Sequence, residues 1–140
     1  LAPRTHDQVQ PFLDMHYLYG LARACRPEAD ALLRAVEDFA PRAPALTRDA
    51  WQRVAVPACH GLLAHARGEF ARAAEAMAEA RPRLQAIGGS HAQRDLFEQI
   101  LIAALLRSNQ RERARALLQP QFAASPQSVR LRRRLALATG

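Results

Sequence analysis

The densest group of polar side chains in the sequence is Ser90, His91, Gln93, Arg94 and Asp95, directly after a Gly-Gly pair. The order Ser-x-x-Gln is that of a capping box, in which the Ser90 side chain accepts from the Gln93 amide and the Gln93 side chain returns to Ser90. The same stretch has the chemistry of an anion or peptide-terminus site, because free amides, a helix dipole and Arg94 attract a carboxylate or phosphate. We expect a structural role, completed by an Arg94–Asp95 ionic contact. The anion site, tuned by His91 with pH, is the alternative.

A second pair of groups with acid–base chemistry is Asp14 and His16. Residues two apart on a helix point about 200° away from each other, so these two cannot form one catalytic dyad. His16 shares a helix face with Phe12 and Tyr19, which favours a hydrogen-bonded histidine in the core. Each of the two can still pair with a residue of another element.

The remaining histidines and the cysteines do not have the spacing of metal ligands. His60 and His65 are five positions apart, and no acid completes a zinc set around them. Cys25 and Cys59 lie in apolar helical stretches, where a free cysteine acts as a small hydrophobe. No GxSxG, P-loop or GxGxxG motif is present. We therefore expect no metal and no cofactor, and the low use of cysteine favours a reducing, cytoplasmic location.

The net charge of +7 comes from 20 basic residues, all of them arginine. Acidic residues alternate with arginine along most of the chain, a pattern typical of solvated helix faces, so we do not expect a nucleic-acid partner. The one basic concentration is Arg130, Arg132, Arg133 and Arg134. Three partners are open for this arginine cluster: the rest of a longer chain, an acidic protein, or RNA. The longest apolar run, Ile100–Leu106, is too short to cross a bilayer.

Helical periodicity, capping residues and proline positions predict seven helices. Their approximate ranges are 11–25, 27–40, 48–66, 70–87, 90–107, 110–120 and 126–138. No Val/Ile/Thr alternation predicts a strand. The fold class is therefore all-α, with the apolar helix around Ile100–Leu106 as its most buried element.

Several helix ends are predicted from single residues. Thr47 is a good N-cap for the third helix, and Pro57 must kink that helix or split it. Gly68 supplies a left-handed cap. The apolar phase continues past Pro82, which predicts a bend there and not a stop. Pro120 is expected to disturb the end of the sixth helix.

The start of the last helix also has a local signature. Ser125-Pro126 is typical of an N-cap followed by proline at the first helical position. The helix that follows is expected to bury Val129, Leu131 and Leu135.

The chain matches itself with a period of about 42 residues, with Arg26, Gly68 and Gln110 at equivalent turns between paired helices. The middle unit resembles a tetratricopeptide repeat. Gly61 stands at the close-packing position of its first helix, and the second helix carries small residues around a bulky one, at Ala73, Met77 and Ala80. Small residues at these positions let helices approach closely, so that stacked pairs share one elongated core.

A more specific resemblance lies at Leu84–Phe97, LQAIGGSHAQRDLF, which is similar to the signature of the tetratricopeptide repeat protein 38 family. Supporting stretches are FLDMHYLYGLA, with Asp14 and His16, then LLAHARGEFARAAE and ARALL followed by SP. The resemblance implies an α-helical repeat fold and identifies residues 1–140 as a single domain from the C-terminal part of a longer protein. It implies no catalytic residues.

These observations together predict a tetratricopeptide-like α-α superhelix of three helix pairs and a terminal helix. Its expected role is non-catalytic binding of a protein, a peptide or the rest of its own chain. The predicted binding groove is lined by residues of about 11–25, 48–66 and 90–107, with His60, His91 and Arg94 as its polar side chains. The alternatives are an enzyme in which Asp14 and His16 converge with His91 and Arg94, and an arginine-rich nucleic-acid-binding module.

Overall fold

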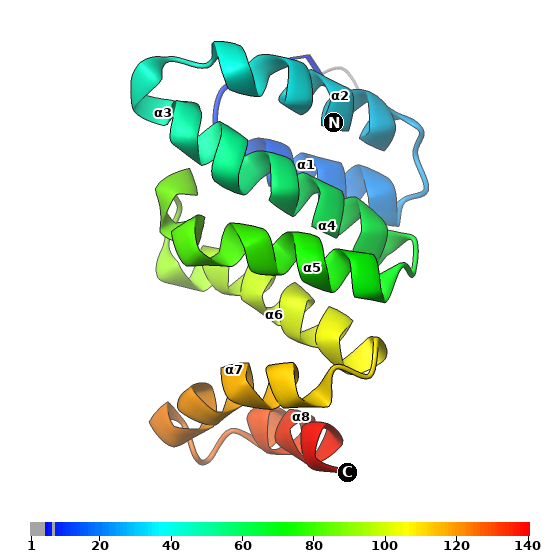
Figure 1. The fold of residues 1–140 in the computed structure, drawn as a ribbon, viewed down its shortest axis with the longest axis vertical. Helices are drawn as coiled ribbons and strands as arrows, with labels where there is room; N and C mark the ends of the chain where they lie inside the picture. Colours follow the sequence, from blue (N-terminus) through cyan, green and yellow to red (C-terminus); the bar gives the residue numbers. More distant parts are fainter. Residues whose placement is uncertain (1–4, 7) are drawn as a thin grey trace.

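A computed structural model describes residues 5–6 and 8–140, and over these residues the chain is helical and contains no strand. The all-α prediction is therefore confirmed. The helices form an elongated stack, with α1, α2 and α3 toward one end and α7 and α8 at the other (Figure 1). The α-helices are α1 (Pro11–Arg23), α2 (Glu28–Phe39), α3 (Ala45–Ala50), α4 (Val56–Ala66), α5 (Phe70–Ala80), α6 (His91–Arg107), α7 (Arg111–Ala124) and α8 (Val129–Thr139). Other helical segments are η2 (Ala40–Arg42), η3 (Trp51–Ala55) and η4 (Arg81–Ile87).

Three of the tight turns share one geometry. Cys25, Gly68 and Asn109 follow α1, α4 and α6, and their φ angles are 53°, 80° and 60°. In each turn the next amide donates to the carbonyl five residues earlier, which is the Schellman arrangement. These bonds are Arg26 N to Leu21 O (2.9 Å), Glu69 N to Ala64 O (2.9 Å) and Gln110 N to Leu105 O (2.8 Å). The left-handed cap predicted at Gly68 is confirmed. The left-handed residues of the other two turns lie one position before Arg26 and Gln110.

The third predicted helix is a continuous run of α3, η3 and α4. It begins at Ala45 after Pro44, so the N-cap predicted at Thr47 is wrong; the Thr47 hydroxyl instead donates to Pro44 O at 3.3 Å. Pro57 neither splits nor ends the run, because a π-helical turn, η3, precedes it. Pro57 then stands in the first turn of α4, where the missing amide hydrogen has no partner within that helix.

The predicted helix over 70–87 is interrupted, so the expectation of a bend without a stop at Pro82 is wrong. The α-helix α5 ends at Ala80, and the chain continues as the 3-10 segment η4. Arg83, within η4, has a non-helical φ of −118°. The cause is local: proline lacks the amide donor, and its ring clashes with the carbonyl four residues earlier.

The C-terminal hairpin also departs from its sequence signals. Helix α7 continues through Pro120 to Ala124, and Ser125 caps its end with an amide that donates back to the helix. The N-cap of α8 is therefore Ser128, whose hydroxyl accepts from the Leu131 amide at 3.3 Å, and the predicted Ser125 cap is wrong. Leu131 is buried as predicted, whereas Val129 is 56% exposed.

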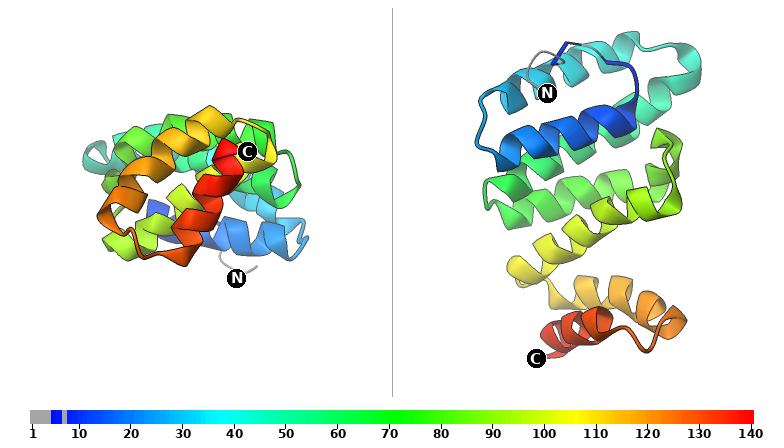
Figure 2. Two further views of the ribbon diagram at one scale, coloured as in Figure 1. Left: turned by 90° about the horizontal axis from the view of Figure 1, so that it is seen from below. Right: turned by 180° about the vertical axis from the view of Figure 1, so that it is seen from behind.

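One apolar core runs along the stack. Trp51, Phe97, Met15 and Leu62 are among its largest fully buried side chains. Helix α1 packs beside α4, and α5 packs beside both α4 and α6, as the front view (Figure 1) and the view from behind (Figure 2) show. The stretch Ile100–Leu106 of α6 contributes most of its residues to this core. The prediction that this helix is the most buried element is wrong, because a larger share of the residues of α4 is buried. Within the part of the chain that the structure describes, no helix is long and apolar enough to cross a membrane.

Candidate functional site

The polar cluster at the start of α6 forms the predicted capping box. The Gln93 amide donates to Ser90 Oγ at 3.2 Å, and the Ser90 amide donates to Gln93 Oε1 at 2.8 Å. Both residues therefore satisfy backbone groups at the helix end. These two bonds give both side chains a structural role at the start of α6.

Arg94 stabilises the turn that precedes α6. Its Nη1 donates to the carbonyl of Gly88 at 3.2 Å and to the carbonyl of Gly89. Gly89 itself lies against α1, since a Cβ added there would be 3.0 Å from the Phe12 ring. Glycine is needed at both positions because both φ angles are positive, and at Gly89 also because α1 lies close to the backbone.

The predicted Arg94–Asp95 ion pair is wrong, because among the described residues Arg94 bonds only to backbone carbonyls. The Asp95 carboxylate instead accepts from Gln99 Nε2 at 3.1 Å, one turn along α6. Adjacent residues on a helix point about 100° apart, which turns the two charges away from each other.

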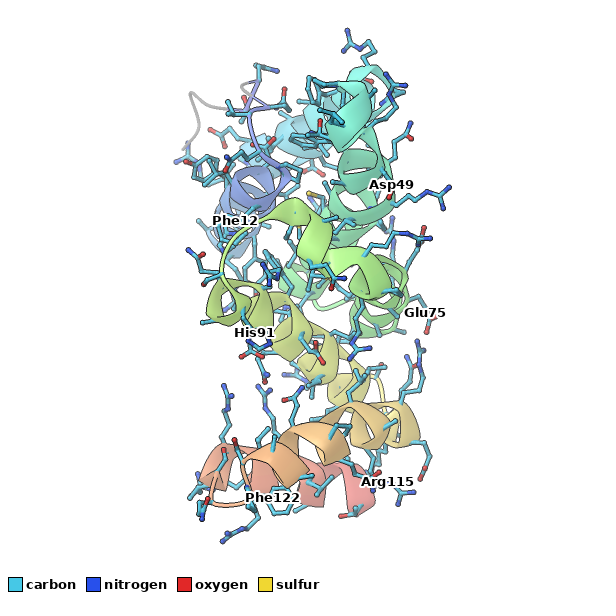
Figure 3. The ribbon with its side chains drawn as sticks, turned by 90° about the vertical axis from the view of Figure 1, so that its left-hand side faces the viewer. Phe12, Asp49, Glu75, His91, Arg115 and Phe122 are labelled. Atoms are coloured by element: carbon cyan, nitrogen blue, oxygen red, sulfur yellow. The ribbon has the colours of Figure 1, made fainter. Side chains whose placement is uncertain are left out.

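A cleft of about 740 Å³ separates the start of α6 from the α7–α8 hairpin. Figure 3 faces this side of the molecule, with His91 above the gap and Phe122 below it. Of the residues predicted for a site, His91, Arg94 and Asp95 line the cleft. The other walls come from η4, α7 and α8. The remaining lining residues are Arg81, Pro82, Leu84, Gln85, Ala92, Glu98, Gln121, Ala124, Ser125, Arg130 and Leu131.

A polar network crosses the inner end of the cleft and joins four elements. Glu98 accepts from Arg81 Nη2 at 3.0 Å and from Gln121 Nε2 at 3.3 Å. Gln99, 9% exposed, donates to Gln121 Oε1 at 3.4 Å and accepts from Arg134. The hairpin is thus held to η4 and α6 through hydrogen bonds between side chains from well-separated parts of the sequence.

Asp14 and His16 lie away from this network. The His16 ring packs against Phe12 and Phe97 in tilted and edge-on geometry, with centroid distances of 4.2 and 5.0 Å, and its Nδ1 is 2.8 Å from Phe12 O. This agrees with a packed, hydrogen-bonded histidine. Asp14 is buried on the other side of α1. Burial raises the pKa of the Cys59 thiol, and the charges of Asp14 and Glu37 add to this effect.

His60 belongs to a separate recess. Its Nε2 is 2.7 Å from Glu37 Oε1, so it links α4 to α2. It lines a cavity of about 160 Å³ together with Asp30 and Arg67, which form an ion pair at 2.7 Å. The structure therefore places His60 apart from His91 and Arg94.

One cluster was missed by sequence reasoning, which weighed His65 only as a metal ligand. Tyr19 Oη lies 3.2 Å from His65 Nδ1, the Phe70 ring is 5.5 Å from the His65 ring, and Arg107 lies 4.4 Å over Phe70. The cluster joins α1, α4, α5 and α6. Burial lowers the pKa of His65, and the nearby Arg23 and Arg107 lower it further. A sequence signal was available for three of the four residues: His65, Phe70 and Arg107 each lie within three positions of a left-handed turn residue.

The described residues contain no group of three or more His, Cys, Asp or Glu side chains that could hold a metal ion. In comparisons with known proteins, no family model matches the chain and no solved structure matches it.

Proposed function

We propose that the chain is a tetratricopeptide-like α-α superhelix and, as its sequence resemblance implies, part of a protein of the tetratricopeptide repeat protein 38 family. Three features support the repeat architecture: the shared geometry of the turns at Cys25, Gly68 and Asn109, the packing of α1 beside α4, and the close approach at Gly61. A Cβ on Gly61 would lie 2.6 Å from Met77 Cγ, so this pair of helices needs a glycine where they meet. Stacked helix pairs of this kind form extended surfaces that bind other chains.

We propose further that this domain binds a protein or peptide segment and does not catalyse a reaction. The observation that supports this best is the cleft between α6 and the α7–α8 hairpin. Its volume of about 740 Å³ and its mixed polar and apolar walls suit a segment of polypeptide. Arg130 and His91 line the cleft, are exposed and make no side-chain hydrogen bond to other described residues, which leaves both available to a partner.

The contacts of the acidic residues in the cleft favour binding over catalysis. A general base needs a lone pair that points at the substrate. Asp95 accepts from Gln99, and Glu98 accepts from both Arg81 and Gln121. These contacts hold the walls of the cleft together, so we assign the two carboxylates a structural role.

The test is to select binders from a library of random peptides displayed on phage, using the purified chain as bait. Enriched peptides are then measured against the parent and against two tryptophan variants. Ala92→Trp fills the cleft from its exposed wall, whereas Ala71→Trp adds the same bulk at an exposed position of α5 that lines no part of the cleft. We expect Ala92→Trp alone to weaken binding, by about tenfold or more.

Two results would overturn the proposal. One is a selection that enriches no peptide above the background of an empty support. The other is equal loss of binding in Ala92→Trp and Ala71→Trp, with both variants retaining the helical circular dichroism of the parent.

A further inference from the structure

The charges around the cleft are not balanced. Arg81, Arg94 and Arg130 line it, against two acids, Asp95 and Glu98. Arg134 follows Arg130 by about one turn of α8 and donates to Gln99. Glu98 is paired with Arg81 at 3.0 Å. Asp95 lies close enough to Arg134 for its charge to act on the guanidinium. Arg94 and Arg130 are thus left without a carboxylate partner among the described residues.

Positive charge is also crowded on the α8 side of the cleft. Arg130 and Arg134 are four residues apart on α8 and therefore share a face. Burial lowers the pKa of Arg134 and the charge of Arg130 lowers it further, which is the effect of like charges held close together. An anion in the cleft beside Arg130 would relieve this repulsion.

A smaller, mostly apolar recess adjoins the cleft. It has a volume of about 280 Å³ and lies where α5, α6 and α7 meet. Its walls are mostly apolar, and besides Arg81, Pro82 and Arg113 they consist of Ala78, Leu101, Leu105, Ala116 and Leu117. Arg81 and Pro82 line both this recess and the cleft, so the two are neighbours on either side of the Arg81 side chain.

We propose that the cleft and the recess together bind an extended acidic peptide segment, with its carboxylates beside Arg130 and Arg94 and a neighbouring bulky apolar side chain in the Leu101–Leu105–Leu117 recess. This inference rests on the proposed function and specifies the partner. Charge complementarity selects acidic segments and speeds their association with the cleft. Burial of an apolar side chain in the recess strengthens the binding. The binding is weakened by salt, because Arg130 is solvent-exposed.

The experiment uses three labelled synthetic peptides and fluorescence anisotropy. The parent peptide carries paired glutamates beside a phenylalanine, the second replaces the glutamates with glutamine, and the third replaces the phenylalanine with alanine. We expect the parent to bind best and each replacement to weaken binding by about tenfold. Equal binding of the glutamine peptide and the parent would overturn the assignment.

A matched pair of variants locates the site. Arg130→Glu reverses a charge that lines the cleft, and Arg133→Glu makes the same change at an exposed position of α8 outside it. We expect only Arg130→Glu to weaken binding of the acidic peptide. Equal losses in the two variants would show diffuse attraction to a basic surface and would overturn the assignment. A single-stranded oligonucleotide that displaces the peptide and binds more tightly would also overturn the assignment. It would show that the cleft prefers the phosphates of a nucleic acid to the carboxylates of a peptide.

The two proposals fail in different ways. If library peptides bind the cleft but show no preference for acidic residues, the acidic assignment fails and the interaction function stands. If neither the library nor the three synthetic peptides bind, both proposals fail.

Discussion

Tyr19 and His65 join the first helix pair to the second, with Tyr19 Oη 3.2 Å from His65 Nδ1. The contact lies among Phe70, Arg107 and Arg23, so a proton on His65 would place a third cation in a partly buried cluster. This arrangement makes the stack sensitive to acid at one definite point.

The first prediction follows from the lowered pKa of His65. A histidine whose pKa is lower in the folded than in the unfolded state stabilises the fold above the unfolded value, 6.5 here, and this stability is lost as the pH falls toward the folded pKa. We expect the free energy of unfolding to decrease from about pH 7.5 to about pH 5, and His65→Gln to flatten this dependence. Urea unfolding at each pH measures it, with His91→Gln as the control at an exposed histidine. An unchanged slope in His65→Gln would contradict the prediction.

The second prediction concerns the crossing of α4 and α5 at Gly61. Gly61→Ala places a methyl group 2.6 Å from Met77 Cγ and 3.1 Å from the Met77 amide nitrogen, so side chain and backbone must both move. We expect a loss of about 1–3 kcal/mol in the free energy of unfolding. Combining Gly61→Ala with Met77→Ala should cost less than the sum of the two single changes, because the shorter side chain removes part of the clash. Additive effects would show that the methyl group does not press on Met77.

The third prediction separates the roles of residues at the start of α6. Ser90→Ala removes the acceptor for the Gln93 amide and should cost about 1 kcal/mol. Arg94→Ala leaves the Gly88 and Gly89 carbonyls without their donor and should cost about 1–2 kcal/mol. His91→Ala, at an exposed position, should stay within about 0.5 kcal/mol of the parent. Chemical denaturation of the three variants measures these differences, and a neutral Arg94→Ala would remove its role in the turn.

The fourth prediction concerns the docking of the α7–α8 hairpin. Gln99→Ala removes the residue that bonds to both Gln121 and Arg134, and we expect a loss of about 1–3 kcal/mol because their polar groups lose partners. The effect should be local, with faster hydrogen exchange in α8 than in α4. Gln119→Ala, at an exposed position of α7, is the control. A uniform increase of exchange along the stack would contradict a role specific to the hairpin.

Sequence reasoning succeeded where the signal and the structure it specifies lie within a few residues. The capping box at Ser90 and Gln93 and the left-handed turn at Gly68 are of this kind. The same reasoning failed where two local signals competed. Ser125 precedes a proline and matches an N-cap, yet it ends α7, and Ser128 caps α8 instead. Which serine caps the helix depends on where α7 ends, and Pro120 alone does not determine that.

The π turn before Pro57 illustrates a further limit. The sequence predicts that Pro57 disturbs a helix, but it does not predict how. Trp51, in this turn, is buried with its ring 4.9 Å from that of Phe39 in α2, so tertiary packing fixes the position of the turn. A local rule for proline contains no information about that neighbour.

The sequence by itself determined the all-helical class, most helix ends and the equivalent turns after α1, α4 and α6, because backbone hydrogen bonds there are satisfied by residues within about one turn. Only the tertiary structure decided which polar side chains meet. It brings His91, Arg94 and Asp95 to one cleft with Arg130 from α8, and it places His60 in a separate recess beside Glu37. Such meetings depend on the angles at which helices pack, and those angles are set by side-chain shapes along the whole interface.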